Sequence, residues 1–120
     1  MPDTQKNLYK KLLGRLGEGK ARRYLRKKGF KIIEKNYITK FGEVDLIGLY
    51  GDFLVFIEVK TRTSHAYGEA MEAVDEAKQQ RYRKSAEFYY LYQTDRSLQP
   101  RFDIVEVYPD KINHIEDAFQ

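Results

Sequence analysis

The feature that most constrains the fold of this chain is a two-residue turn between two runs of alternating apolar residues. Gly51 and Asp52 separate the runs 42–50 and 53–62. Glycine at the first position of such a turn is typical of a type II′ β-hairpin, and the turn fixes which residues of the two strands face each other. One side of the predicted hairpin then carries the opposed pairs Leu49 with Leu54, Ile47 with Phe56, Asp45 with Glu58, and Glu43 with Lys60.

The far end of this hairpin is predicted to bring two carboxylates together. Side chains directly opposite each other have Cβ atoms roughly 5 Å apart, so Asp45 and Glu58 converge on one point. Two like charges in that arrangement destabilise a sheet and raise each other's pKa, and a divalent cation removes both penalties. Ligand sets made only of oxygen favour Mg²⁺ or Mn²⁺. The other side, which we expect to be buried, is wholly apolar and pairs Gly48 with Val55, Leu46 with Ile57, and Val44 with Val59.

Lys60 adds an ammonium group to this acidic end. It lies two residues beyond Glu58 and therefore on the same side of the strand. Metal-activated water, together with a lysine that offsets charge on phosphoryl oxygens, is the chemistry of phosphodiester hydrolysis. The alternative is a surface ladder of ion pairs, in which Asp45 and Glu58 flank Lys60 and Arg62. A slip of one residue in the register would break the acidic pair altogether.

The rest of the chain predicts a single α/β domain over residues 1–120. A basic helical segment at 1–29 precedes a three-strand meander at 30–62. A crossover helix at 69–93 and a strand at 101–108 follow, and such a crossover normally places its two strands parallel. We therefore expect a mixed β-sheet with flanking helices in the order α-β-β-β-α-β, and a short strand or helix in the tail. The predicted strands and tail are Phe30–Ile38, Gly42–Tyr50, Phe53–Arg62, Arg101–Tyr108 and Ile112–Phe119.

Positive charge is concentrated at the N-terminus. Residues 1–31 contain eleven Lys and Arg against two acids, a net charge of +9 in a chain whose total is +4. A basic arm on a more acidic body predicts a surface that faces a polyanion, although a solvated helix face explains the same charges. Gly14, Gly17 and Gly19 cluster in this helix, which indicates either close packing or a bend between two helical pieces. The predicted nucleic-acid-binding residues are Arg15, Arg22, Arg23, Arg26, Lys27, Arg62, Lys78 and Arg81.

Three further charged side chains border the predicted packed faces of the helices. The inner stripe of the second helix is predicted to contain Ala70, Val74, Ala77, Phe88 and Tyr92. Lys78 and Arg81 fall within that stripe, where a cation needs an anionic partner such as the acidic end of the sheet or a bound phosphate. Either side chain could instead extend to solvent. Glu18 borders the packed face of the first helix, either as a third carboxylate or as the i+4 partner of Arg22.

The composition excludes several classes of protein. The chain has no cysteine, which excludes disulfides, thiol catalysis and cysteine-held zinc, and two isolated histidines do not make a histidine-rich metal site. No apolar run reaches signal-peptide or membrane-spanning length, so we expect a cytoplasmic protein without a membrane partner. Tyr89, Tyr90 and Tyr92 are too many for one buried stripe. We expect some of them at the surface, for stacking on bases or for a protein contact such as a homodimer.

Two segments resemble a known motif. Residues 42–47 (Gly-Glu-Val-Asp-Leu-Ile) and 58–62 (Glu-Val-Lys-Thr-Arg) resemble the split PD-(D/E)xK motif of restriction-endonuclease-like proteins, with valine in place of its proline. The wider pattern resembles the small bacterial YraN-like family over nearly the whole chain. Beyond the motif segments, the matching pieces are Gly17-Glu18, Ala21, Leu25, Asn36, Gly68, Lys78, Arg101-Phe102-Asp103 and Ala118-Phe119. For Arg101 and Asp103, a salt bridge across Phe102 is an adequate explanation.

The resemblance implies a restriction-endonuclease-like or Holliday-junction-resolvase-like core. It implies metal ligation by Asp45, Glu58 and the carbonyl of Val59, with Lys60 as the catalytic lysine. Glu18 would be the helix-one acid found in resolvase-like relatives. The implied activity is that of a Mg²⁺-dependent nuclease, or a Mn²⁺-dependent one, which acts on nucleic acid and chiefly DNA in repair, recombination or uptake. A non-catalytic nucleic-acid-binding or protein-interaction domain on the same fold is the alternative.

Overall fold

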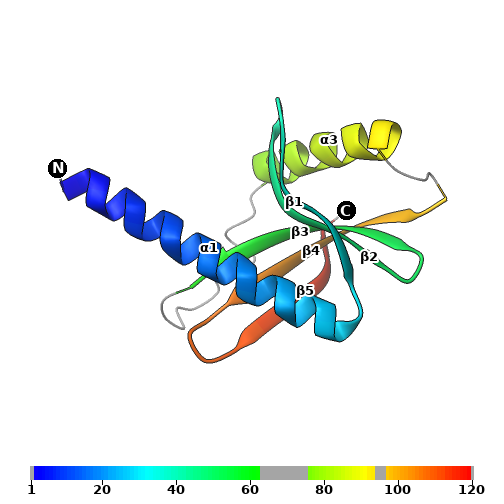
Figure 1. The fold of residues 1–120 in the computed structure, drawn as a ribbon. Helices are drawn as coiled ribbons and strands as arrows, with labels where there is room; N and C mark the ends of the chain where they lie inside the picture. The colour runs from blue at the N-terminus through cyan, green and yellow to red at the C-terminus, as the bar shows by residue number, and fades with distance from the viewer. Residues whose placement is uncertain (1, 63–75, 94–96, 120) are drawn as a thin grey trace.

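The computed structural model describes residues 2–62, 76–93 and 97–119, which form a five-stranded sheet and two helices (Figure 1). In chain order the elements are α1 (Pro2–Lys28), β1 (Lys31–Thr39), β2 (Gly42–Tyr50), β3 (Phe53–Thr61), α3 (Glu76–Gln93), β4 (Gln99–Val107) and β5 (Ile112–Phe119). The predicted α/β class and the order of its elements are confirmed, and the tail is a strand. The first part of the predicted helix 69–93 lies outside the described residues.

The five strands lie side by side in the order β1-β2-β3-β4-β5. Neighbouring strands are antiparallel except for β3 and β4, whose parallel pairing confirms the predicted crossover. The hairpin register is confirmed from the turn as far as Leu46 and Ile57, since Leu49 pairs with Leu54 and Ile47 with Phe56. The predicted pairs beyond that point, including Glu43 with Lys60, are not formed in the described sheet. Gly51 has a φ of 58°, which glycine adopts without steric cost. The turn chemistry therefore sets the register of the central strands.

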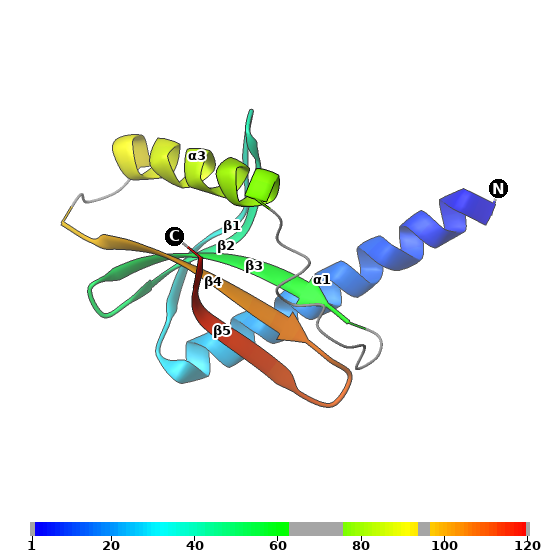
Figure 2. The same ribbon diagram turned by 180° about the vertical axis from the view of Figure 1, so that it is seen from behind.

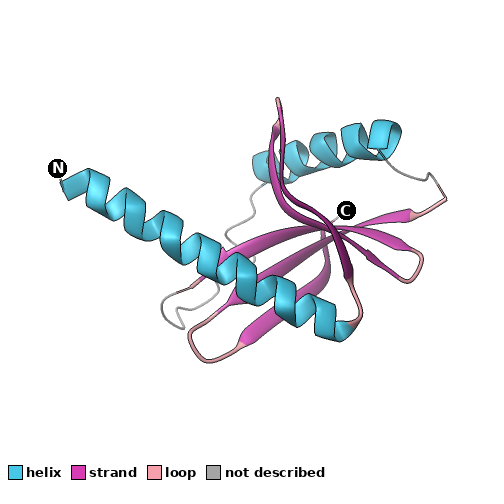
Figure 3. Ribbon diagram, viewed as in Figure 1, coloured by secondary structure: helices cyan, strands magenta, loops and turns pink. Residues whose placement is uncertain are grey.

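One helix covers each face of the sheet, as the two opposite views show (Figures 1 and 2). The core under α1 contains Ala21, Leu25, Leu46, Val55, Ile57 and Val105. The core under α3 contains Ile47, Leu54, Phe56, Tyr82, Tyr89 and Phe102. The N-terminal half of α1 extends past the sheet (Figure 3), and its Leu8 and Leu12 are 61% and 56% exposed. Neither described helix combines the length and apolar character needed to cross a membrane.

The α1 helix is continuous, so the bend considered from its glycines is wrong. Close packing is instead confirmed at Gly17, where an added Cβ would overlap the hydroxyl group of Thr61 on β3. At Gly14 an added Cβ would meet no atom within 4 Å. The helix ends at Lys28 and is followed by Gly29, whose φ of 113° suits a C-terminal glycine. A single glycine thus lets α1 approach the strand that carries the predicted site.

The predicted inner stripe of the second helix is wrong in its rotation. Ala77 is exposed, and Phe88 and Tyr92 are 42% and 70% exposed. The side chains that α3 buries against the sheet are Tyr82, Ser85, Ala86 and Tyr89. Small residues let the helix approach the sheet, and a tyrosine ring can be buried while its hydroxyl group keeps a hydrogen bond. The close approach of the helix and the hydrogen-bonded tyrosine explain why this face is buried in place of the predicted face with Phe88 and Tyr92.

Candidate acidic site where β2 and β3 separate

The two strands of the central hairpin separate close to the predicted acidic pair. Backbone pairing between β2 and β3 ends at Leu46 with Ile57. Beyond that point the Val59 N–H donates to Asp45 Oδ2 at 2.8 Å, so a side chain takes the place of a backbone acceptor. β2 continues along β1 toward α3 (Figure 1). We call the space between Asp45 on β2 and residues 58–60 on β3 the β2–β3 fork.

The separation corrects two details of the predicted hairpin. Val44 was expected on the same side as Leu46, but it packs with Tyr82 in the core under α3. The strict alternation of β2 is interrupted because its residues beyond Leu46 pair only with β1 in the described sheet. Asp45 and Glu58 are consequently not a direct cross-strand pair, although the charge of Glu58 still raises the pKa of Asp45.

Glu58 is a buried carboxylate with donors on both oxygens. It is 5% exposed, and its Oε1 lies 2.6 Å from Lys78 Nζ and 2.8 Å from Lys60 Nζ. Its Oε2 accepts a hydrogen bond from the Tyr82 hydroxyl group. Burial by itself raises the pKa of Glu58, but the hydrogen bonds from Lys60, Lys78 and Tyr82 outweigh it and lower the pKa. Glu58 is therefore an anion at neutral pH.

Asp45 is the opposite case. Burial, followed by the charge of Glu58, raises its pKa to about 7, and the hydrogen bond from Val59 opposes the rise. Among the described residues it accepts that one side-chain hydrogen bond and forms no ion pair. Asp45 therefore gains or loses its proton near neutral pH.

Two more acids approach the fork from α1 and from the start of β2. With its amide nitrogen turned toward them, Asn36 donates to both carboxylate oxygens of Glu18 at 3.3 Å and to Glu43 Oε1 at 2.9 Å. Asn36 has a φ of 52°, a left-handed conformation that asparagine tolerates better than most residues. Burial raises the pKa of Glu18, and the hydrogen bond from Asn36 partly offsets the rise. Asn36 thus connects the two acids.

The residues predicted to be catalytic gather around the fork. Glu58 and Lys60 are in direct contact, and the charges of both Glu58 and Glu18 act on Asp45. Lys78 has the acidic partner considered for it, since it pairs with Glu58. Arg81 is exposed, so its predicted place on the inner stripe is wrong for the same reason as the stripe itself.

The remaining predicted nucleic-acid-binding residues divide into groups. Arg15 and Arg22 lie close enough to Glu18 for their charges to lower its pKa. Arg62 Nε lies 3.6 Å from the buried Glu106 Oε2. On the later turns of α1, the predicted residues that are exposed are Arg23, Arg26 and Lys27. Some of the α1 cations therefore lie near the acidic site, and others lie on the outer surface of the helix.

Sequence reasoning missed the roles of Tyr82 and Asn36. The spacing of Lys78 and Tyr82, which are four residues apart on one helix, was the available signal for Tyr82. Asn36 belongs to the family pattern, but only the left-handed backbone at that position brings its amide to the acids.

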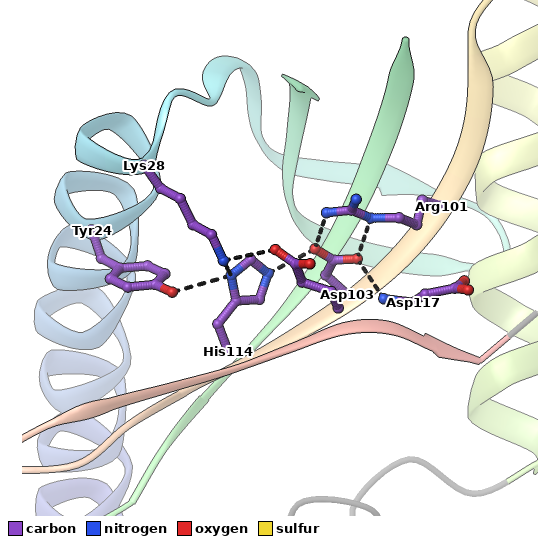
Figure 4. Close-up of polar contacts among 7 residues, drawn as sticks. Tyr24, Lys28, Arg101, Asp103, His114 and Asp117 are labelled. Carbon is purple, nitrogen blue, oxygen red and sulfur yellow. Dashed lines mark hydrogen bonds and ion pairs between the residues drawn. The ribbon is translucent and has the colours of Figure 1, made fainter. Parts of the chain in front are cut away.

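A second polar cluster lies between α1 and the strands β4 and β5 (Figure 4). Asp103 is fully buried and accepts hydrogen bonds from Arg101 Nε at 2.9 Å and Nη2 at 2.8 Å, which confirms the predicted salt bridge. His114 Nε2 lies 2.7 Å from Asp103, and its Nδ1 lies 3.3 Å from the Tyr24 hydroxyl group and 3.2 Å from Lys28 Nζ. The cluster joins α1 to β4 and β5, and so helps to orient the helix that carries Glu18.

The fold and the site define a small mixed α/β protein with a partly buried acidic cluster where two strands separate. The model of the uncharacterised protein family UPF0102 matches residues 17–107, and the chain belongs to that family. A UPF0102 protein of Caldanaerobacter subterraneus is 50% identical over 95% of this chain and 99% of its own. UPF0102 proteins of Thermodesulfovibrio yellowstonii and Alkaliphilus metalliredigens are each 45% identical, over 89% and 91% of this chain and 95% and 98% of their own. The matched range includes the whole acidic site.

Proposed function

We propose that this protein is a metal-dependent phosphodiester hydrolase that cleaves nucleic acid, with the β2–β3 fork as its active site. The observation that carries the proposal is the half-buried Asp45, which accepts a hydrogen bond from Val59 of β3 and whose pKa is raised to about 7 beside the ionised Glu58. Groups with strongly shifted pKa values cluster at functional sites, and a divalent cation offsets both charges. The resemblance of the two motif segments to restriction-endonuclease-like proteins supports the same reaction.

The donor set around the fork fits Mg²⁺ or Mn²⁺. Asp45 and Glu58 offer only carboxylate oxygens, which these ions prefer. The N–H and C=O groups of one strand residue point to the same edge of the strand, so the carbonyl of Val59 faces the same edge as its N–H, toward Asp45. No three acidic or histidine side chains within the described ranges make a ready ligand group. A bound ion would supply an activated water molecule and would offset charge on the phosphoryl oxygens.

The protein's own residues divide the remaining work. Lys60, whose side chain is 23% exposed, is the cation that we expect to contact a phosphoryl oxygen. Tyr82 is a positioning residue, because its hydroxyl group fixes the orientation of the Glu58 carboxylate. Glu18, whose pKa is raised, is the candidate group for accepting a proton.

A cleavage assay tests the proposal. Purified protein is incubated with labelled duplex, junction, flap and single-stranded substrates in Mg²⁺, Mn²⁺ or EDTA. We expect cleavage in either metal, and its loss in EDTA and in the Asp45→Asn and Glu58→Gln variants. Asp52→Asn, which makes the same chemical change in an exposed turn, is the matched control and should cleave normally. Failure of the folded wild-type protein to cleave any of these substrates would overturn the enzymatic proposal.

One observation favours a second candidate, a non-catalytic nucleic-acid-binding domain. Both oxygens of Glu58 already have donors, so the acid can serve as a structural ion pair without a metal. In that case nucleic acid should bind with a steep dependence on salt and with no dependence on Mg²⁺. Calorimetry with Mn²⁺ separates the two candidates. Only a hydrolase should bind the ion, and the binding should then be absent in Asp45→Asn.

A further inference from the structure

We infer that a groove leading from the fork along α1 to the β4–β5 hairpin binds an unpaired strand of nucleic acid. The assignment of this strand as the substrate rests on the proposed function, whereas its binding does not. Three adjoining cavities of about 360, 320 and 520 Å³ form the groove. The first includes Glu18 and Val59 at the fork, and it shares Thr61 with the second. The second shares Lys20 and Tyr108 with the third.

The third cavity has the charge that a phosphate backbone requires. Four cations line it, Lys20, Arg23 and Lys27 from α1 and Lys111 from the β4–β5 hairpin, and no carboxylate is among its lining residues. Cations on both walls can contact the backbone of one strand from two sides. Lys20 and Lys111 were not among the nucleic-acid-binding residues predicted from the sequence, because only the fold brings the hairpin alongside the helix.

Tyrosines line the same groove and favour unpaired bases. Tyr24 and Tyr108 are partly exposed in the third cavity, and Tyr9, which is 61% exposed, lines the second. A tyrosine ring stacks on the face of a base, which is accessible in a single strand and covered in a duplex. From Lys10 to Lys27 the helix spans about 25 Å. At roughly 3.4 Å for each phosphate this is enough for about seven nucleotides, and for fewer when the strand is stretched.

Fluorescence anisotropy in EDTA tests the inference, because binding is then measured without cleavage. The probe is a labelled single-stranded DNA of about 12 nucleotides, compared with a duplex of the same length. We expect tighter binding of the single strand, and a loss of roughly fivefold or more in Tyr9→Leu. Arg23→Gln and Lys111→Gln should each reduce the slope of log affinity against log salt by about 0.7. The matched controls are Tyr92→Leu and Lys84→Gln, which change exposed residues of α3 on the other face of the sheet and should leave both quantities unchanged.

Several results would overturn the inference. One is equal affinity for the single strand and the duplex. Another is a loss of affinity in the α3 controls as large as in the groove variants. The third is groove-dependent binding of heparin or of anionic lipid vesicles that is tighter than the binding of DNA. Single-strand binding through the groove without cleavage would leave the inference standing and overturn the proposed function. Cleavage of flaps at the wild-type rate by the double variant Arg23→Gln/Lys111→Gln would overturn the inference and leave the proposed function standing.

Discussion

Replacement of Asp45 with asparagine is expected to stabilise the metal-free protein at neutral pH. The asparagine oxygen can still accept the hydrogen bond from Val59, and its amide places no negative charge beside Glu58. Burial, followed by the charge of Glu58, raises the pKa of Asp45 from 3.8 to about 7. A carboxyl group whose pKa is raised by folding stabilises the folded state while it is protonated. Its penalty therefore begins above pH 3.8, the unfolded-state value, and is complete above about pH 7.

The size of the effect follows from the same pKa. At 1.36 kcal/mol for each pKa unit, the full penalty on the free energy of unfolding is about 4 kcal/mol. Linkage places about 1.7 kcal/mol of this penalty at pH 5 and nearly all of it at pH 8. The stability gap between Asp45→Asn and the wild-type protein should thus widen by about 2–3 kcal/mol over that range. Asp45 keeps some contact with solvent, so we expect a value near the lower end.

Urea unfolding in EDTA at pH 5 and pH 8 measures this gap. Asp52→Asn is the control, because it removes the same charge from an exposed position and its stability should follow that of the wild-type protein at both pH values. Addition of Mg²⁺ at pH 8 should narrow the gap, since an ion that binds only the folded wild-type protein stabilises it alone. A gap that stays constant between pH 5 and pH 8 would refute the assignment of Asp45 as an acid whose pKa is raised by folding.

Four further substitutions test the packing and the polar clusters. Gly17→Ala should destabilise the fold by about 1–3 kcal/mol through overpacking, whereas Gly19→Ala should stabilise it by up to about 1 kcal/mol. Equal urea midpoints for the two variants would contradict the close packing of Gly17. Tyr82→Phe should weaken Mn²⁺ binding about tenfold in calorimetry, and an unchanged affinity would remove its positioning role. Asp103→Asn leaves the buried Arg101 without its anion and should cost about 3–5 kcal/mol in urea unfolding at pH 7. Burial raises the pKa of Asp103, but its hydrogen bonds outweigh burial and lower the pKa. The cost of Asp103→Asn should therefore shrink as the pH falls below 3.8 and through the pKa of the folded state. A cost that stays constant with pH would contradict this reasoning.

The central hairpin could be predicted because its information is local. Gly51 and Asp52 set the turn, and the alternating residues on either side set the faces of the strands. The approach of Asp45 to Glu58 followed from that register. The fork between them did not, because it depends on how β2 pairs with β1 beyond Leu46. Beyond that residue the partners of β2 on β1 are Tyr37, Ile38 and Thr39, and the turn does not determine this pairing.

The rotation of α3 and the place of Asn36 depend on contacts between distant elements. Apolar periodicity favoured the face with Phe88 and Tyr92, but contact with the sheet selected the face with Ser85 and Ala86. The left-handed backbone at Asn36 occurs inside a strand, where nothing in the neighbouring residues predicts it. Both features complete the acidic site, so its outline was predictable and its supporting contacts were not.

Titration of Mn²⁺ into the protein in a calorimeter at pH 7, in two buffers of different ionisation enthalpy, most directly tests whether the fork is a metal site. Because the pKa of Asp45 is about 7, half of these carboxyl groups carry a proton at that pH. Binding should release about half a proton for each ion, and almost none at pH 9. It should vanish in Asp45→Asn and persist in Asp52→Asn. Absence of binding by the wild-type protein, or equal binding by Asp45→Asn, would contradict a metal site at the fork.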